Sequence, residues 1–145
     1  MKVEGSYQFK SPRQAVWDAF LAPGVLAQCI PGCQSLEPES QDTFNIVMKV
    51  GVAAISDTYT GKVSISDKSP LQSYRMLVQG KGSSGSVKGE GLIQFSDTDD
   101  GTEVHISGDA QVTGIVARVG QRLMGGTSKL LLNQFTNCIK SKLEG

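Results

Sequence analysis

Asp57 and Tyr59 are the residues whose types and spacing most directly indicate chemistry. They lie two positions apart in a segment that alternates between apolar and polar residues, and both fall in the apolar phase. A buried carboxylate beside a phenol either acts as an acid–base couple or orients a bound ligand through hydrogen bonds. In a third interpretation, Asp57 lies at the open rim of its strand, where water solvates it. The sequence leaves these three interpretations open.

Nucleophilic and metal-dependent catalysis find little support in the remaining residues. The single histidine, His105, falls in the solvent phase of its segment, so no Ser-His-Asp or Cys-His group can be assembled with it in the apolar phase. The spacing of Cys29 and Cys33 differs from that of a zinc knuckle, so we interpret both as small residues that pack a tight turn. An odd number of cysteines in a chain without a secretion signal favours reduced thiols over a disulfide framework.

Composition and one apparent motif exclude several classes of function. With 14 basic and 14 acidic residues among 145, the chain does not have the charge of a general nucleic-acid binder, and its length predicts one domain over residues 1–145. The sequence has neither an apolar run long enough to span a bilayer nor a signal peptide, which predicts a cytoplasmic protein. Residues 80–85 match a dinucleotide-binding fingerprint by letter, but a strand follows them instead of a helix, so they predict a hairpin loop.

Hydrophobic periodicity predicts the elements that position these residues. Residues 2–10 alternate as a strand, Ser11-Pro12-Arg13-Gln14 reads as the capped start of a short helix through Phe20, and Pro23 opens a second short helix. Segments that alternate between apolar and polar residues follow at 44–50, 55–65, 74–80, 87–95 and 104–112. This alternation is typical of antiparallel strands with one solvent-exposed face. The predicted class is α+β: a curved antiparallel sheet of six to seven strands around a long C-terminal helix.

Glycines in the apolar phase of these strands indicate a cavity. Five positions where Val or Ile is usual hold glycine: Gly61, Gly80, Gly89, Gly91 and Gly108. An inner face with few large side chains leaves room for an apolar ligand. Alternatively, the glycines only mark bulges and bends. The predicted cavity residues are Phe20, Leu26, Ile30, Met48, Val50, Asp57, Tyr59, Met76, Val78, Ile93, Val116, Val119, Gly120, Leu123, Met124 and Thr127.

Residues 114–143 predict one long helix with two different faces. At 100° per residue, an apolar side extends from Val116 to Gln134 and Cys138. A basic stripe lies opposite this side and consists of Arg118, Arg122, Lys129 and Lys140. The stripe is either a solvated face or a partner-binding surface. Leu132, Ile139 and Leu143 lie off the apolar side, and such residues beside lysines can mark a docking surface or a contact with a membrane surface.

Two segments of the chain resemble the CoxG family, named for the G subunit of carbon monoxide dehydrogenase. They are residues 22–33, which include Cys29-Ile30-Pro31-Gly32-Cys33, and residues 114–123 with Gln134-Phe135, and the resemblance covers nearly the whole chain. It implies the helix-grip fold of START lipid-transfer domains, Bet v 1-like proteins and polyketide cyclases, built around a hydrophobic cavity. Members of the family accompany molybdenum-containing carbon monoxide dehydrogenases and are implicated in membrane association. The family has no established catalytic residues to transfer to this chain.

The resemblance and the cavity together lead us to expect a non-enzymatic carrier. Its ligand is a lipid or, from the chemistry of a dehydrogenase that feeds a respiratory chain, an isoprenoid quinone. The expected partner is a carbon monoxide dehydrogenase-type molybdenum hydroxylase, at the inner face of the cell membrane, and no metal or covalent cofactor is expected. The alternatives are a small cyclase or dehydratase that uses Asp57 and Tyr59, and an adaptor that docks an acidic enzyme surface with its basic stripe.

Overall fold

The computed structural model describes the chain except for residues 1, 31, 53–54, 84, 115–131 and 144–145. Within the strands, the side chains of residues 50–52, 55–57, 112 and 114 also lie outside the description. Every structural statement below concerns the remaining residues.

In the described part of the chain, seven strands and three helical segments follow one another. They are β1 (Lys2–Phe9), α1 (Arg13–Leu21), α2 (Pro23–Cys29), β2 (Cys33–Ser40), β3 (Thr43–Val52), β4 (Ile55–Ser69), β5 (Ser73–Gly82), β6 (Gly85–Thr98), β7 (Gly101–Gly114) and a helix over residues 132–143. The predicted strands and short helices are confirmed. Strand β2 was not predicted individually, because its exposed second half, with Glu37, Pro38 and Glu39, lacks the alternation of a half-buried strand.

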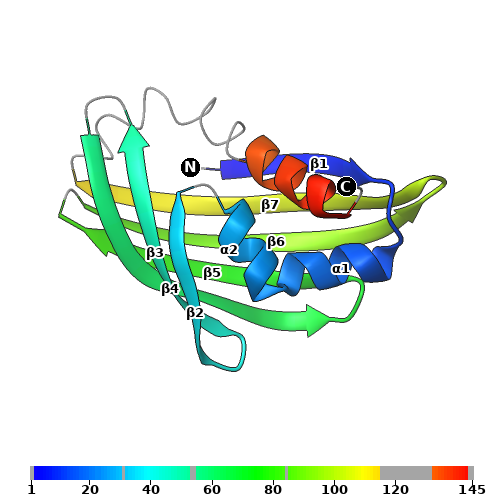
Figure 1. Ribbon diagram of the computed structural model, residues 1–145, viewed down its shortest axis with the longest axis horizontal. Helices are drawn as coiled ribbons and strands as arrows, with labels where there is room; N and C mark the ends of the chain where they lie inside the picture. The colour runs from blue at the N-terminus through cyan, green and yellow to red at the C-terminus, as the bar shows by residue number, and fades with distance from the viewer. Residues whose placement is uncertain (1, 31, 53–54, 84, 115–131, 144–145) are drawn as a thin grey trace.

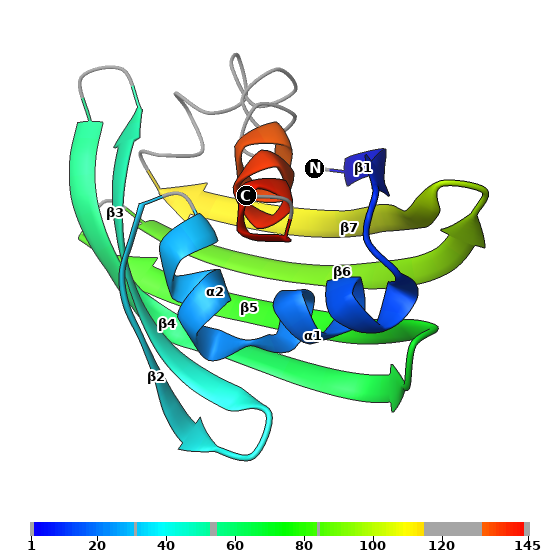
Figure 2. The same cartoon turned by 45° about the vertical axis from the view of Figure 1, so that its right-hand side comes forward.

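The described strands form one antiparallel sheet in the order β1-β7-β6-β5-β4-β3-β2. After the edge strand β1, the helices α1 and α2 carry the chain across to the opposite edge, and β2 to β7 then return as a meander that pairs β7 with β1. The sheet is strongly curved, and the described helical segments lie on its concave side (Figures 1 and 2). Because a sheet with one apolar face must cover it, this side holds the core.

The start of α1 differs from the predicted capping box. Pro12, expected as the first helical residue, is the N-cap, and the side chain of Gln14 donates to the Oδ1 of Asp18, 3.0 Å away, instead of capping. The Ser11 carbonyl instead accepts a hydrogen bond of 2.9 Å from the hydroxyl of Thr102, which is fully buried in β7. The junction between β1 and α1 is therefore fixed by the sheet, and a local capping motif is not needed.

An aromatic cluster joins the helices to the sheet, with Phe20 of α1 at its centre. Phe20 is 0% exposed, and its ring centroid lies 5.7 Å from that of Phe9, 5.5 Å from that of Phe95 and 5.7 Å from that of Phe135. Each of these pairs packs edge to face, the geometry that the ring quadrupole favours. Trp17 makes similar contacts with Tyr74 and Phe95. One cluster thus ties α1 to β1, β5, β6 and the C-terminal helix.

The C-terminal helix packs with a different face from the predicted one. Gly114, expected to begin the helix, is the last residue of β7. Ile139 was placed off the apolar side but is 0% exposed, and Leu132, Phe135 and Leu143 pack against the core, whereas Gln134 is exposed. The prediction assumed that one apolar face continues from Val116 to the end of the segment. In the structure, the buried face of residues 132–143 is set by i, i+3, i+4 spacing of the residues that pack toward Phe20.

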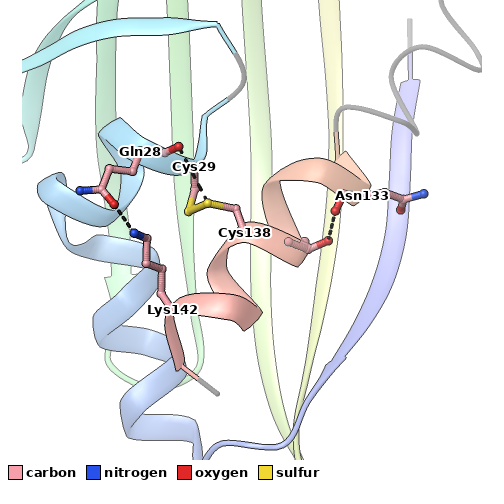
Figure 3. Close-up of a disulfide and its surroundings, with 6 residues drawn as sticks. Gln28, Cys29, Asn133, Cys138 and Lys142 are labelled. Atoms are coloured by element: carbon pink, nitrogen blue, oxygen red, sulfur yellow. Dashed lines mark hydrogen bonds between the residues drawn. A yellow bond between two sulfur atoms is a disulfide. The ribbon is translucent and has the colours of Figure 1, made fainter. Parts of the chain in front are cut away.

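A disulfide joins Cys29 to Cys138, so the expectation of three reduced thiols is wrong for two of them. The sulfur atoms lie 2.14 Å apart and link the end of α2 to the C-terminal helix across 109 residues (Figure 3). Cys33 keeps a free thiol. Counting cysteines does not reveal the pair, because only the packing of α2 against the C-terminal helix brings the two residues together.

Replacing Phe20 with alanine tests the role of the aromatic cluster. We expect Phe20→Ala to lower the free energy of unfolding by about 3–5 kcal/mol, because it empties the position where four rings meet. Leu77→Ala is the matched control: Leu77, on the convex face, is 38% exposed, and its loss should cost no more than about 0.5 kcal/mol. Urea denaturation of both variants measures the difference. Equal losses would contradict the assigned core.

Candidate functional site

The concave face of the sheet divides into two halves of different composition. We call one the aromatic half; it includes Phe9, Tyr74, Ile93, Phe95 and Val104, all buried. The other, the glycine half, lies toward the opposite ends of the same strands and includes Gly80, Gly89, Gly91, Gly108 and Ala110. Both sets share one face of the sheet, because Gly89 and Gly91 alternate in phase with Ile93 and Phe95.

Pairing across the strands brings these small residues together. Gly91 of β6 lies opposite Gly108 of β7, and Gly89 lies opposite Ala110. On the other side of β6, the same two glycines face Met76 and Val78 of β5. A patch of the concave face therefore has little side-chain volume across β6 and β7, and Met76 and Val78 of β5 border it.

The glycines of this face serve two different purposes. A Cβ at Gly61 would overlap the carbonyl oxygen of Gln79, and one at Gly108 would lie 2.8 Å from the carbonyl oxygen of Glu90, so both positions need glycine for close backbone approach.

The other three glycines leave room for a side chain. Among the described residues, a Cβ at Gly80, Gly89 or Gly91 would meet no atom nearer than 3.7, 3.7 and 3.5 Å respectively, which is ordinary van der Waals contact. Glycine at these three positions reduces the side-chain volume on the concave face, although the neighbouring backbone would tolerate a Cβ there.

The predicted cavity residues are distributed over both halves. Phe20 and Ile93 fill the aromatic half, and Leu26 is buried in α2, so in the structure these three have a packing role. Ile30 is the half-buried C-cap of α2.

The residues nearest the glycine half come from β3, β4 and β5. Met48 lies opposite Tyr59 in the register of β3 and β4, and Met76 and Val78 lie on β5. Tyr59 is 5% exposed, whereas Met48, Met76 and Val78 are half-buried. These partly covered apolar side chains beside a glycine patch are the strongest candidates for contact with a ligand.

Several predicted site residues lie wholly or partly outside the described part of the chain. Val50 and Asp57 are paired in the register of β3 and β4, but their side chains lie outside the description, so the proposed Asp57–Tyr59 couple stays a prediction. The cavity residues Val116, Val119, Gly120, Leu123, Met124 and Thr127, and the basic residues Arg118, Arg122 and Lys129, all lie outside the described residues.

Lys140, the remaining residue of the predicted basic stripe, packs against the end of β1. Its Nζ lies 5.5 Å from the centroid of the Phe9 ring, a cation–π contact. It also lines a surface hollow of about 510 Å³, together with residues 8–10 and 98–100. This hollow lies at the aromatic end of the sheet and is distinct from the glycine half.

Tyr74 is a buried phenol that the sequence placed among the apolar residues of its strand. Its hydroxyl donates to the carbonyl oxygen of Phe20 at 3.4 Å, and burial raises its pKa above the ordinary value of 10. The group is therefore neutral at physiological pH and serves to hold α1 on the sheet. Within the described part of the chain, no group of three or more His, Cys, Asp or Glu residues is placed to bind a metal ion.

Alanine substitutions separate the two kinds of glycine. We expect Gly80→Ala to be neutral or stabilising by up to about 1 kcal/mol, because the methyl group makes only ordinary van der Waals contact with the described atoms and the unfolded chain loses entropy. Gly61→Ala should destabilise by more than about 2 kcal/mol, since its Cβ would force two strands apart. Thermal unfolding of the two variants checks both signs. If Gly80→Ala lost as much stability as Gly61→Ala, the space assigned to a side chain at Gly80 would be contradicted.

Comparison with known proteins identifies relatives of the fold and of the sequence. A conserved protein of solved structure from Geobacillus kaustophilus is 33% identical and has a TM-score of 0.93, with 99% of this chain and 95% of that one covered. The Zhui aromatase/cyclase from Streptomyces sp. R1128 has a TM-score of 0.65 at 16% identity, covering 99% and 93%. A protein from Mycobacterium smegmatis has a TM-score of 0.72 at 15% identity, covering 99% and 90%. The last two likenesses concern the fold alone.

The family assignment rests on the match along the sequence. A search among curated proteins finds no match. Residues 5–144, however, match the family described as the G subunit of carbon monoxide dehydrogenase (CoxG), which agrees with the resemblance seen in residues 22–33 and 114–123. With its seven-stranded helix-grip architecture and a family match over almost its entire length, the chain belongs to the CoxG family.

Proposed function

We propose that this protein is a non-enzymatic carrier of a lipophilic molecule, accessory to a carbon monoxide dehydrogenase-type molybdenum enzyme. The observation that carries the proposal is that, among the described residues, a Cβ at Gly80, Gly89 or Gly91 on the apolar concave face meets other atoms only at van der Waals distance. A concave apolar surface with few polar groups is the usual form of a site for an apolar ligand. Backbone packing explains Gly61 and Gly108, but it does not explain these three glycines.

The side chains around the patch suit an apolar ligand. Met48, Met76 and Val78 retain partial exposure, so covering them with a ligand removes further apolar surface from water. Methionine is unbranched and polarizable, so it adapts to ligands of irregular shape. The ligand that we propose is an isoprenoid quinone, whose tail lies along the glycine half while the Tyr59 hydroxyl or a nearby backbone group hydrogen-bonds its head.

The family supplies the partner in this proposal. CoxG is named as a subunit of carbon monoxide dehydrogenase, and an oxidoreductase that passes electrons to a respiratory chain needs access to a lipid-soluble acceptor. A carrier meets that need by moving the quinone between the membrane surface and the enzyme. In the described residues, no helix is long and apolar enough to cross a membrane. Because a carrier of this kind must collect its quinone at the membrane, we propose peripheral contact with the inner face of the membrane.

Native mass spectrometry of the protein purified without detergent tests the proposal. We expect the wild-type protein to retain a quinone or lipid, or to take up an added short-chain menaquinone. Gly89→Leu should weaken this uptake roughly tenfold or more, because the new side chain occupies the patch. Lys88→Leu is the matched control: it adds a leucine at the neighbouring, exposed position on the opposite face of β6.

The outcomes of this experiment separate ligand binding from folding. Folded wild-type protein that neither retains nor takes up any lipophilic molecule would overturn the proposal. Equal uptake by Gly89→Leu and Lys88→Leu would place the ligand elsewhere in the molecule.

A further inference from the structure

The Cys29–Cys138 disulfide is a covalent link between α2 and helix 132–143. Cys29 ends α2 and is 4% exposed, while Cys138 lies in the middle of helix 132–143 and is half-buried. Their Cα atoms are 5.4 Å apart, within the range that a disulfide requires. Because the two cysteines lie 109 positions apart in a chain of 145 residues, the bond closes about three quarters of the chain into a loop and restricts it when the protein unfolds.

Among the described residues, the other contacts of the C-terminal helix are non-covalent. Lys142 donates a hydrogen bond to the side chain of Gln28, next to the disulfide (Figure 3). Phe135 packs on Phe20, and Ile139 is buried in the core. A helix as short as residues 132–143 is marginal by itself in water, so these contacts must hold both its position and its structure once the covalent link is absent.

We propose that the Cys29–Cys138 pair is a reversible redox clasp that controls the attachment of helix 132–143 to the rest of the fold. In the oxidised form the helix is fixed to α2. In the reduced form it is held by its apolar face and by Lys142, and it opens more often, exposing Phe135, Ile139 and the ring of Phe20 without loss of the sheet. This device regulates access to the concave face and does not depend on which ligand that face binds.

The chemistry of the clasp is a thiol–disulfide exchange with an external dithiol. One thiolate of the dithiol attacks the sulfur of Cys138, the more exposed of the pair, and Cys29 leaves as a thiolate that takes up a proton. The second thiol of the reductant then attacks the mixed disulfide and releases Cys138 as a thiol. Two electrons pass to the protein, and the dithiol becomes a disulfide. In a reducing compartment such pairs are usually transient and regulatory; this step alone rests on the cytoplasmic location proposed above.

Cys33 is not part of the clasp and provides the control. It lies four positions after Cys29, and its thiol donates to the carbonyl oxygen of Ser35 at 3.4 Å. Burial raises its pKa, so little of it is in the nucleophilic thiolate form at neutral pH. Cys33→Ser should therefore leave the disulfide and its behaviour unchanged.

Hydrogen exchange measured by mass spectrometry tests the clasp in the full chain. The samples are oxidised wild-type protein, wild-type protein reduced with dithiothreitol, Cys138→Ser and Cys33→Ser. Reduction and Cys138→Ser should each accelerate exchange in residues 132–143 by roughly tenfold or more, while β5 and β6 stay protected. Oxidised Cys33→Ser should match the oxidised wild type, and reoxidation should restore slow exchange.

Three results would overturn the clasp. One is the same exchange in residues 132–143 before and after reduction. Another is loss of protection throughout the sheet on reduction, which would make the disulfide a staple of the whole fold. The third is alkylation of three thiols in protein kept under oxidising conditions, which would show that the bond does not form. Quinone uptake is not measured, so failure of the carrier proposal leaves this test intact.

Discussion

The edge-to-face packing around Phe20 is the interaction on which the rest of the structure depends. Its ring touches Phe9 of β1, Phe95 of β6 and Phe135 of the C-terminal helix, so it joins elements from both ends and the middle of the chain. A seven-stranded sheet with one apolar face must bury that face. Among the described helical segments, the rings of Trp17, Phe20 and Phe135 lie over the aromatic half of that face.

The glycine half of the concave face differs from the aromatic half in side-chain size. Away from the aromatic rings of α1, the strands hold Gly80, Gly89 and Gly91, where an added Cβ would meet described atoms only at van der Waals distance. Large residues at these positions would fill the face and enlarge the core. In the described part of the chain, a patch with little side-chain volume lies beside the aromatic core, and the carrier proposal assigns the ligand to this patch.

The sequence predicted the sheet well, because period-two alternation is set directly by burial of one face. It failed where contacts between distant residues decide the outcome. The pairing of Cys29 with Cys138 and the burial of Ile139 both depend on the docking of the C-terminal helix, which no local pattern encodes. The glycines in the apolar phase predict a cavity, which stays a prediction, and only the approach of neighbouring backbones distinguishes Gly61, which must be glycine, from Gly80, which need not be.

The most direct test of the account is the response of the methionine methyl groups to a quinone. In a protein with ¹³C-labelled methionine and leucine methyls, titration with a short-chain menaquinone should shift the resonances of Met76, which borders the glycine half, and of Met48, which lies farther along the same concave face. The resonances of Leu77, on the convex face, should stay in place. Shifts confined to Leu77, or no shift in any methyl group at saturating quinone, would contradict a ligand site on the concave face.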